Sequence, residues 1–522
     1  MIGTWLNATR RQRELAELDD VGTVDLIVVG GGVVGAGVAL DAVTRGLSVV
    51  LLESKDLAAG TSGMSSKLMH GGLRYLARGE IGLAYESARE RALALSHIAP
   101  HLIQPLPFLT PYGPGFTVHG AALPLAGLWA ADLMRRVAGS RRAQLPPPRR
   151  VTPAEARLLV PRLTSYGLQG AVETWDAQLV DDARLVLGLA RTAASYGARI
   201  LTRCTVEKVV DRVAVVRDEL SGQRLDIRGR AVVNATGVWA SRLEPAVRLR
   251  PSRGVHLVVS SEALGHPRAA LTVPVPGQPH RFVFALPQDD GTVYIGVTDT
   301  PVPHSGDIAE LQPAVSPAEQ RFLVEVLGQC LEEPITPDAI LGSFAGLRPL
   351  LEHGVGLTSD LSRRHEIIDD GNGLITVVGG KLTTYRRMSA QAVDHAVSRY
   401  RLPAAPSRTA RLPLVGSAPP ARLATLRAPR RLVRRYGAEA VSLLQLAEAE
   451  PHLLRPVAEG VPALGVEFVF GALAEGALDV EDLLARRTRL TLVPAWAEAA
   501  RPAAEEAMSR SRRLDPQGRL DL

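Results

Sequence analysis

Cysteine is scarce in this chain of 522 residues. The two cysteines, Cys204 and Cys330, form no CxxC pair, and no cluster of Cys and His has the spacing of a zinc site. This excludes a disulfide-stapled scaffold and a zinc module, and it fits a reducing compartment such as the cytoplasm. We therefore expect no metal ion in the functional site.

Lysine is rare among the basic residues of this chain. Of the 60 basic residues only four are lysines, Lys55, Lys67, Lys208 and Lys381, and the chain carries a net charge of +6. The arginines are scattered in short clusters. A nucleic-acid-binding domain concentrates basic residues on one face or carries a recognition motif, and we find neither. We expect no nucleic-acid partner.

Long hydrophobic runs are also missing. No window approaches the roughly 18 uncharged apolar residues that a membrane-spanning helix needs. The N-terminal segment TRRQRELAELDD is charged and helical, and it lacks the apolar core of a signal peptide. These absences predict a cytoplasmic protein.

The length indicates several domains. A chain of 522 residues exceeds one ordinary core, and its 46% apolar and 22% charged residues are typical of a globular protein. We expect a helical N-terminal extension at 1–22 and a main α/β region at 23–400. A linker at 401–420, rich in proline and alanine, should then lead to a helical C-terminal domain at 421–522.

The clearest local signal lies at residues 24–53. Two apolar runs at 24–30 and 47–53 predict buried parallel strands, with a helix at 33–45 between them. Gly30, Gly32 and Gly35 match G-x-G-x-x-G, a turn that places a pyrophosphate at the N-terminus of a helix. Glu53 ends the second strand, where a carboxylate can accept hydrogen bonds from ribose hydroxyls. This unit predicts a dinucleotide, either NAD or FAD.

Two later strands favour FAD. The apolar runs at 231–237 and 374–380 end in small residues, Ala235-Thr236-Gly237 and Gly379-Gly380. Because they lie hundreds of residues from the first turn, they suggest one extended cofactor touched by discontinuous segments. We also expect a strand at 199–210, antiparallel strands at 254–300 with a hairpin at Asp290-Gly291, and a helix at 384–400.

Longer motifs carry a family resemblance. The chain reads TSGMSSKLMHGGLRY at 61–75 and GGKLTTYR at 379–386, after VVGGGVVGAG near the N-terminus. From about residue 24 to 400, and more weakly beyond, it closely resembles the FAD-dependent glycerol-3-phosphate dehydrogenases. The resemblance implies an α/β fold with a Rossmann-like FAD-binding domain and a mixed, mostly antiparallel β-sheet part that forms the substrate site. A helical C-terminal domain packs beside them.

The resemblance also implies an activity. Such enzymes oxidise sn-glycerol 3-phosphate to dihydroxyacetone phosphate by hydride transfer to FAD, and ubiquinone or menaquinone reoxidises the flavin. They are typically peripheral proteins on the cytoplasmic face of the membrane, and family members suggest a homodimer. A glycerol-3-phosphate oxidase, which uses oxygen and produces hydrogen peroxide, shares the pocket chemistry, and the sequence does not separate the two.

The resemblance further implies the site residues. His256 is the candidate base, Arg348 its electrostatic partner and Asp299 a residue that would orient the base. The planar fork of arginine suits a phosphate dianion. The residues matched to the substrate are Arg74, Tyr75, Arg363 and Lys381, with Arg364 as the alternative to Arg363. The residues matched to the cofactor, besides the glycines of the first turn and Glu53, are Thr61, Ser62, Ser65, Ser66, Lys67, His70, Gly71, Gly72, Ala235, Thr236, Gly237, Gly379, Gly380, Leu382 and Thr383.

Overall fold

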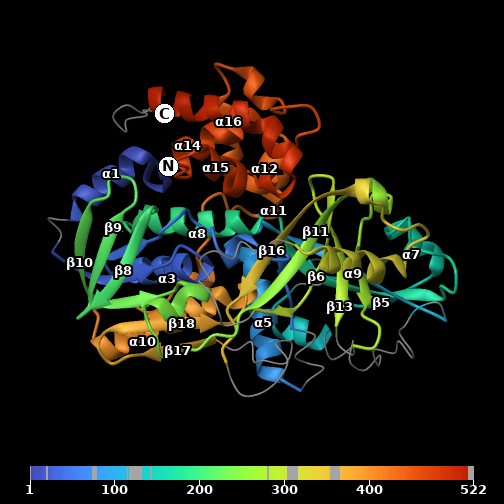
Figure 1. The fold of residues 1–522 in the computed structure, drawn as a ribbon, viewed down its shortest axis with the longest axis horizontal. Coiled ribbons are helices and arrows are strands. Elements are labelled where there is room, and N and C mark those ends of the chain that lie inside the picture. Colours follow the sequence, from blue (N-terminus) through green and yellow to red (C-terminus); the bar gives the residue numbers. More distant parts are fainter. Residues whose placement is uncertain are drawn as a thin grey trace.

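The computed structural model describes residues 2–18, 22–72, 79–114, 116, 132–140, 144–278, 281–302, 315–352 and 365–514. Two β-sheets lie side by side, and the helices of the C-terminal part pack where the sheets meet (Figure 1). The expected α/β fold with a second, mostly antiparallel sheet and a helical C-terminal part is confirmed.

The first sheet has a parallel centre. β1 (Thr23–Val29) pairs in parallel with β2 (Val49–Leu52) and with β10 (Arg224–Asn234), and β10 pairs in parallel with β18 (Leu374–Gly379). The strand order is β17-β18-β10-β1-β2-β7, with β17 (His365–Asp369) and β7 (Arg199–Leu201) at the edges. All four central strands end at the same edge, so the residues that follow them can meet one ligand.

Both faces of this sheet are covered, which explains why its strands are continuous apolar runs. On one face Leu26 and Val28 pack into a core with α3 (Val33–Thr44), α8 (Asp182–Ser195) and α10 (Tyr385–Tyr400). On the other face Ile27 and Val29 pack beside the antiparallel strands β8 (Cys204–Val210) and β9 (Val213–Asp218).

One expected strand proved to be two. Residues 199–210 form β7 and β8, separated by Thr202 and Arg203, and Arg203 has a φ of 57°. β7 pairs in parallel with β2, whereas β8 turns away to pair with β9. The β-branched residues predicted strand correctly, but they concealed a turn whose left-handed residue is an arginine and not a glycine.

The second sheet has the order β15-β11-β14-β13-β12-β4-β6-β3, and β16 joins it on β11 and β5 on β6. The hairpin expected at Asp290-Gly291 joins β13 to β14. The bounds are β3 (Leu68–Met69), β4 (Ile103–Tyr112), β5 (Arg149–Val151), β6 (Gly170–Leu179), β11 (Ser252–Ser260), β12 (Ala270–Pro274), β13 (Phe282–Pro287), β14 (Thr292–Gly296), β15 (Thr300–Pro301) and β16 (Ile340–Arg348). Its own apolar core includes residues of α7 (Pro153–Leu159) and α9 (Pro317–Gly328). α5 (Ile81–Leu93) continues into a π-helical turn at Ala94–Ile98.

Most of the C-terminal helices contribute residues to a third core. The C-terminal helices are α11 (Pro420–Ala424), α12 (Arg430–Tyr436), α13 (Ala440–Leu446), α14 (Gly465–Ala474), α15 (Val480–Asp482) and α16 (Pro494–Leu514). The N-terminal segment is tied to them, because Trp5 lies in this core and the backbone of Leu6 bonds to Ala474 and Gly476. The helix expected near the N-terminus is α1 (Ala8–Ala16).

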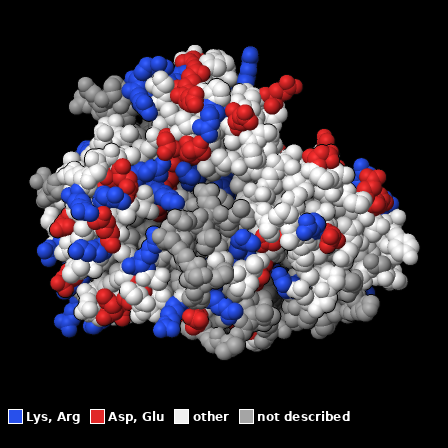
Figure 2. Space-filling view, in the orientation of Figure 1, with Lys and Arg blue, Asp and Glu red and all other residues white. Residues whose placement is uncertain are grey.

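Two surface properties bear on partners. On the face in Figure 2, acidic and basic side chains of the described residues are interspersed, without a large area of one sign. None of the described helices is both long enough and apolar enough to cross a membrane.

Candidate active site

A large cavity is lined by residues of both sheets. Its volume is about 1490 Å³. Typical pockets for small ligands measure roughly 300–1,000 Å³, so this one has room for an extended molecule. The residues that follow β2, β10 and β18 line it, as do the first residues of α3 and the strands β11 and β16.

The glycine-rich turn lies at one wall of the cavity and is packed very closely. Gly30 has a φ of 106°, and a Cβ there would lie 2.7 Å from the carbonyl oxygen of Ala235. A Cβ at Gly35 would lie 1.9 Å from the carbonyl oxygen of Gly30, so the helix can approach the turn only without a side chain. Gly32 and Val33, at the N-terminus of α3, line the cavity. This turn can therefore present a helix N-terminus to a phosphate.

Glu53 is held at the end of β2. Its carboxylate accepts hydrogen bonds from the backbone N–H groups of Gly31, at 2.6 Å, and Lys55, at 2.8 Å. Ser62 completes this corner, because its hydroxyl accepts a bond of 2.9 Å from the backbone N–H of Val33. Hydrogen bonds thus join the glycine-rich turn and the start of α3 to both Glu53 and Ser62.

Most residues matched to the cofactor line this cavity. They are Gly30, Gly32, Glu53, Thr61, Ser62, Ser65, Ser66, His70, Gly71, Gly72, Ala235, Thr236, Gly237, Gly379, Gly380, Leu382 and Thr383. Gly35 is not among the lining residues, and it packs closely against the backbone of Gly30 in the turn.

Lys67 differs from the expectation that it faces the cofactor. It is not among the described residues that line the cavity, and its side chain is buried in the interior. Its backbone has a φ of 55°, and Nζ lies 3.4 Å from Asp182 Oδ1 and 5.0 Å from the centre of the Tyr294 ring. The motif predicted its importance in the loop but not its direction, which depends on a carboxylate over a hundred positions away.

His256 is buried on β11 and faces the cavity. Its ring stacks on Phe344, with 4.7 Å between ring centres, and its Nε2 lies 2.9 Å from the hydroxyl of Ser66. A Cβ at Gly296 would lie 2.4 Å from the imidazole, so this glycine makes room for the ring. Among the described residues, Nδ1 has no hydrogen-bond partner.

Arg348 lies at the end of β16 and also lines the cavity. Its guanidinium donates hydrogen bonds to the hydroxyl of Ser252, at 3.1 Å, and the carbonyl oxygen of Thr298, at 3.2 Å. Gly254 leaves the space that it occupies, since a Cβ there would lie 2.3 Å from Nη2. The structure therefore brings His256 and Arg348 to the same cavity.

Asp299 has a different position from the one expected. We predicted that it would orient His256, but the imidazole instead makes a hydrogen bond with Ser66. Asp299 instead accepts a hydrogen bond from Ser252 and lies 3.5 Å from Arg348. Because β15 follows directly and pairs with the start of β11, Asp299 is placed beside the arginine and not beside the histidine.

Of the residues matched to the substrate, Lys381 lines the cavity. Arg74, Tyr75 and Arg363, together with the alternative Arg364, lie outside the described residues.

An ion pair of the cavity wall was not anticipated from the sequence. Arg91 of α5 pairs with Asp176 of β6 at 2.5 Å, and Asp176 also accepts from the backbone N–H of Gly71 at 3.0 Å. Burial alone would raise the pKa of Asp176, but Arg91 and His70 hold it at about 2. No motif marked this pair, because Arg91 is one of several charged residues of α5 and nothing in the sequence links it to Asp176.

The comparisons with known proteins agree with this geometry. The profile of the FAD dependent oxidoreductase family matches residues 25–386. Glycerol-3-phosphate dehydrogenase 1 of Mycobacterium tuberculosis is 44% identical over 512 residues, which cover 97% of this chain and 98% of that protein. The chain belongs to the family of FAD-dependent glycerol-3-phosphate dehydrogenases. A mitochondrial glycerol-3-phosphate dehydrogenase of Arabidopsis thaliana is 32% identical and covers 91% of this chain.

Solved structures extend the similarity. The glycerol-3-phosphate dehydrogenase of Bacillus halodurans, complexed with FAD, has a TM-score of 0.72 at 27% identity, over 98% of this chain and 97% of that one. The L-alpha-glycerophosphate oxidase of Mycoplasma pneumoniae shares the fold, with a TM-score of 0.55 at 17% identity, over 76% of this chain and 99% of that one. Residues 407–519 match the profile of the C-terminal domain of alpha-glycerophosphate oxidase.

FAD is the cofactor of this family, and the residues present fit it. Backbone glycines leave room beside the α3 N-terminus, and Glu53 stands where ribose hydroxyls would bind. The segments after β10 and β18 line the same cavity, as one long ligand requires. Bound FAD supplies a flavin ring that can accept a hydride.

His256 should make stability depend on pH. Burial, together with Lys67 and Arg348, lowers the pKa of His256 to about 3. In the unfolded chain a histidine takes up a proton below about pH 6.5, so between about pH 6.5 and 3 the unfolded state binds more protons and stability falls as pH falls. From pH 7.5 to 5.0 this one group contributes a loss of about 2 kcal/mol.

The variant His256→Asn should lack that loss. We expect its free energy of unfolding, measured by urea titration at pH 7.5 and 5.0, to fall by about 2 kcal/mol less than that of the unaltered enzyme. His452, whose side chain is 62% exposed, supplies the control variant His452→Asn. Equal losses in the enzyme and in His256→Asn would contradict a neutral, buried His256.

Proposed function

We propose that the enzyme oxidises sn-glycerol 3-phosphate to dihydroxyacetone phosphate and passes the electrons to a membrane quinone. The observation that carries the proposal is the 44% identity, over almost the whole length of both chains, to a protein named glycerol-3-phosphate dehydrogenase. The cavity supports it, because the cations of Arg348 and Lys381 and the imidazole of His256 share one space.

The residues take the following roles in the proposal. Lys381 and Arg348 bind or stabilise negative charge, together with Arg74, Tyr75 and Arg363. His256 removes the proton of the substrate hydroxyl. It is uncharged near neutral pH, and its Nε2 already bonds a hydroxyl, that of Ser66, at 2.9 Å. The positive charge of Arg348 favours the resulting alkoxide.

The quinone and the membrane belong together in this proposal. Ubiquinone and menaquinone dissolve in the bilayer, so the enzyme must meet them at the surface of the bilayer. We propose that this surface is the inner face of the cytoplasmic membrane. The second candidate is a glycerol-3-phosphate oxidase that reduces oxygen to hydrogen peroxide. The C-terminal match to an oxidase domain favours it, whereas the relatives at 39–44% identity are named dehydrogenases.

One experiment separates these functions. The purified flavoprotein is mixed with sn-glycerol 3-phosphate without oxygen, and the visible flavin band is followed. We expect bleaching, rapid recovery with a soluble quinone analogue and slow recovery in air. Rapid recovery in air with peroxide would establish the oxidase. A band that stays unchanged with this substrate, but bleaches with an amine or hydroxy acid, would refute the proposed substrate.

A further inference from the structure

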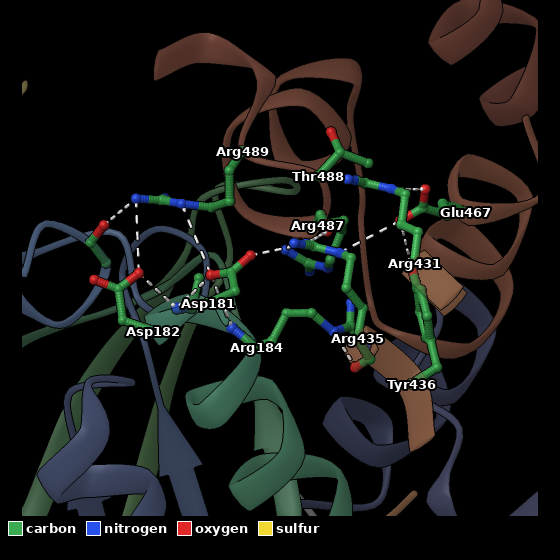
Figure 3. Close-up of polar contacts among 12 residues, drawn as sticks. Asp181, Asp182, Arg184, Arg431, Arg435, Tyr436, Glu467, Arg487, Thr488 and Arg489 are labelled. Carbon is green, nitrogen blue, oxygen red and sulfur yellow. Dashed lines mark hydrogen bonds and ion pairs between the residues drawn. The ribbon is translucent and has the colours of Figure 1, made fainter. Parts of the chain in front are cut away.

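Buried charges connect the C-terminal helices to the segment 60–66, which lines the cavity and which we call the cavity loop (Figure 3). We call these residues the buried ion network. They are Asp56, Lys67, Asp181, Asp182, Arg435, Arg487 and Arg489, and each is at most 8% exposed. The first four lie before residue 183 and the three arginines lie beyond residue 434, so the network joins distant parts of the chain.

Two adjacent carboxylates at the start of α8, those of Asp181 and Asp182, bind different parts of the chain. Asp181 accepts a hydrogen bond of 2.7 Å from Arg435 of α12. Asp182 accepts bonds from the backbone N–H of Ser65, at 2.9 Å, and from its hydroxyl, at 2.7 Å, and lies 3.4 Å from Lys67. One carboxylate therefore holds the C-terminal helices, and its neighbour holds the cavity loop.

Arg489 lies between these two carboxylates, and its guanidinium is 3.8 Å from each of them (Figure 3). It also donates to the backbone carbonyl oxygen of Gly63 and, at 2.9 Å, to that of Ala485. Gly63 is itself confined, because a Cβ there would lie 2.4 Å from the carbonyl oxygen of Ala58. Arg489 thus reaches from the C-terminal part to the backbone of the cavity loop.

Arg487, two residues before Arg489, makes a parallel connection. Arg487 is fully buried and bonds both oxygens of Asp56, at 2.6 and 3.0 Å. Asp56 lies three residues after Glu53. The C-terminal part therefore binds both the segment that follows β2 and the cavity loop, and these two segments form two walls of the cavity.

The loop held by Arg489 leads directly to the candidate base. Ser65 and Ser66 line the cavity, and Ser66 bonds His256. Removing one partner from a buried ion pair leaves an uncompensated charge, so such a network resists displacement. Reacting groups must be held to within a fraction of an ångström, because a displacement of about 1 Å can cost about 100-fold in rate.

We propose that Arg489 is a positioning residue of the active site. It acts through Gly63, Asp182 and Ser65 to hold Ser66 against His256, although it is not among the described residues that line the cavity. The C-terminal helices are then a support of the catalytic centre and not an independent module. The proposal rests on the proposed function only where the reaction with sn-glycerol 3-phosphate is measured.

The test compares Arg489→Met with a matched variant. Arg191 is 1% exposed and bonds both oxygens of Glu439, at 2.8 and 2.7 Å, so it joins α8 to the C-terminal helices without a contact to the loop. In the FAD-loaded Arg489→Met protein we expect the rate constant of flavin bleaching to fall about 100-fold. KM should change less than about threefold, since the substrate cations remain. The visible circular dichroism of the bound flavin should also change.

Arg191→Met should lower the melting temperature at least as much, yet keep the rate constant and the dichroism of the unaltered enzyme. Arg489→Lys retains the charge but not the planar fork, so its rate constant should lie between those of Arg489→Met and the enzyme. It carries the test alone if Arg489→Met does not fold.

Two results would overturn the proposal. One is a normal rate and normal dichroism in FAD-loaded Arg489→Met. The other is an equal loss of rate in Arg191→Met, which would mean that any damage between the same parts has this effect. If the unaltered enzyme fails to react with sn-glycerol 3-phosphate, the proposed function falls, and the dichroism of the two variants still decides the role of Arg489.

Discussion

Arg348→Ala is expected to lower kcat/KM for sn-glycerol 3-phosphate by about 100- to 1,000-fold, the usual cost of removing a group that stabilises charge in a transition state. Arg348 carries a positive charge into the cavity that also contains His256, and Gly254 reserves space for it. Its bonds to Ser252 and Thr298 fix the guanidinium, so it needs no reorganisation when negative charge develops.

The measurement is a steady-state assay with a quinone analogue, after the flavin content of each variant has been matched. Arg348→Lys should recover part of the loss, because the charge returns without the planar fork. Arg253 is the control. Its side chain is 25% exposed against 24% for Arg348, and it pairs with Glu319 at 2.8 Å outside the cavity lining. Near-normal kinetics of Arg348→Ala would refute the assignment of this cavity.

Gly35→Ala should abolish stable FAD binding, with an increase of the dissociation constant of at least about 100-fold. The new Cβ would lie 1.9 Å from the carbonyl oxygen of Gly30, a distance that no real contact reaches. The helix and the turn must therefore move apart, and the α3 N-terminus loses its place beside the phosphates. The ratio of flavin to protein after gel filtration measures the effect.

Gly328→Ala is the matched control for that variant. Gly328 ends α9, and a Cβ there meets no atom within 4 Å. The same added methyl group should leave the flavin content unchanged. If Gly35→Ala retained its flavin through gel filtration, the cofactor would not depend on the close approach of α3 to the turn.

Prediction from sequence succeeded where the information is local. The first βαβ unit follows from two apolar runs, a glycine-rich turn and Glu53, all within thirty-odd positions, and β1, α3 and β2 lie there. The hairpin at Asp290-Gly291 was equally local. The strand at 199–210 failed, because an arginine in a left-handed conformation carries no turn signal.

Most residues that the family motifs matched to the cofactor line one cavity, and His256, Arg348 and Lys381 line the same cavity. Their catalytic and binding roles remain predictions that the variants above test. Motifs did not reveal the direction of Lys67 or the partner of Asp299. Both depend on which side chain packs against them from another strand or helix.

The sequence by itself determined the dinucleotide turn, because apolar periodicity and glycine spacing are displayed directly by a linear chain. Its longer motifs showed the resemblance to the family, and that resemblance implied the two-sheet architecture and the cations and histidine expected at the substrate. Only the tertiary structure decided that Ser66 meets His256, that Asp299 meets Arg348 and that Arg489 reaches the cavity loop. Asp182 and Arg489 are ordinary charges in the sequence, and only folding buries them together, where low exposure to water makes their contacts costly to break.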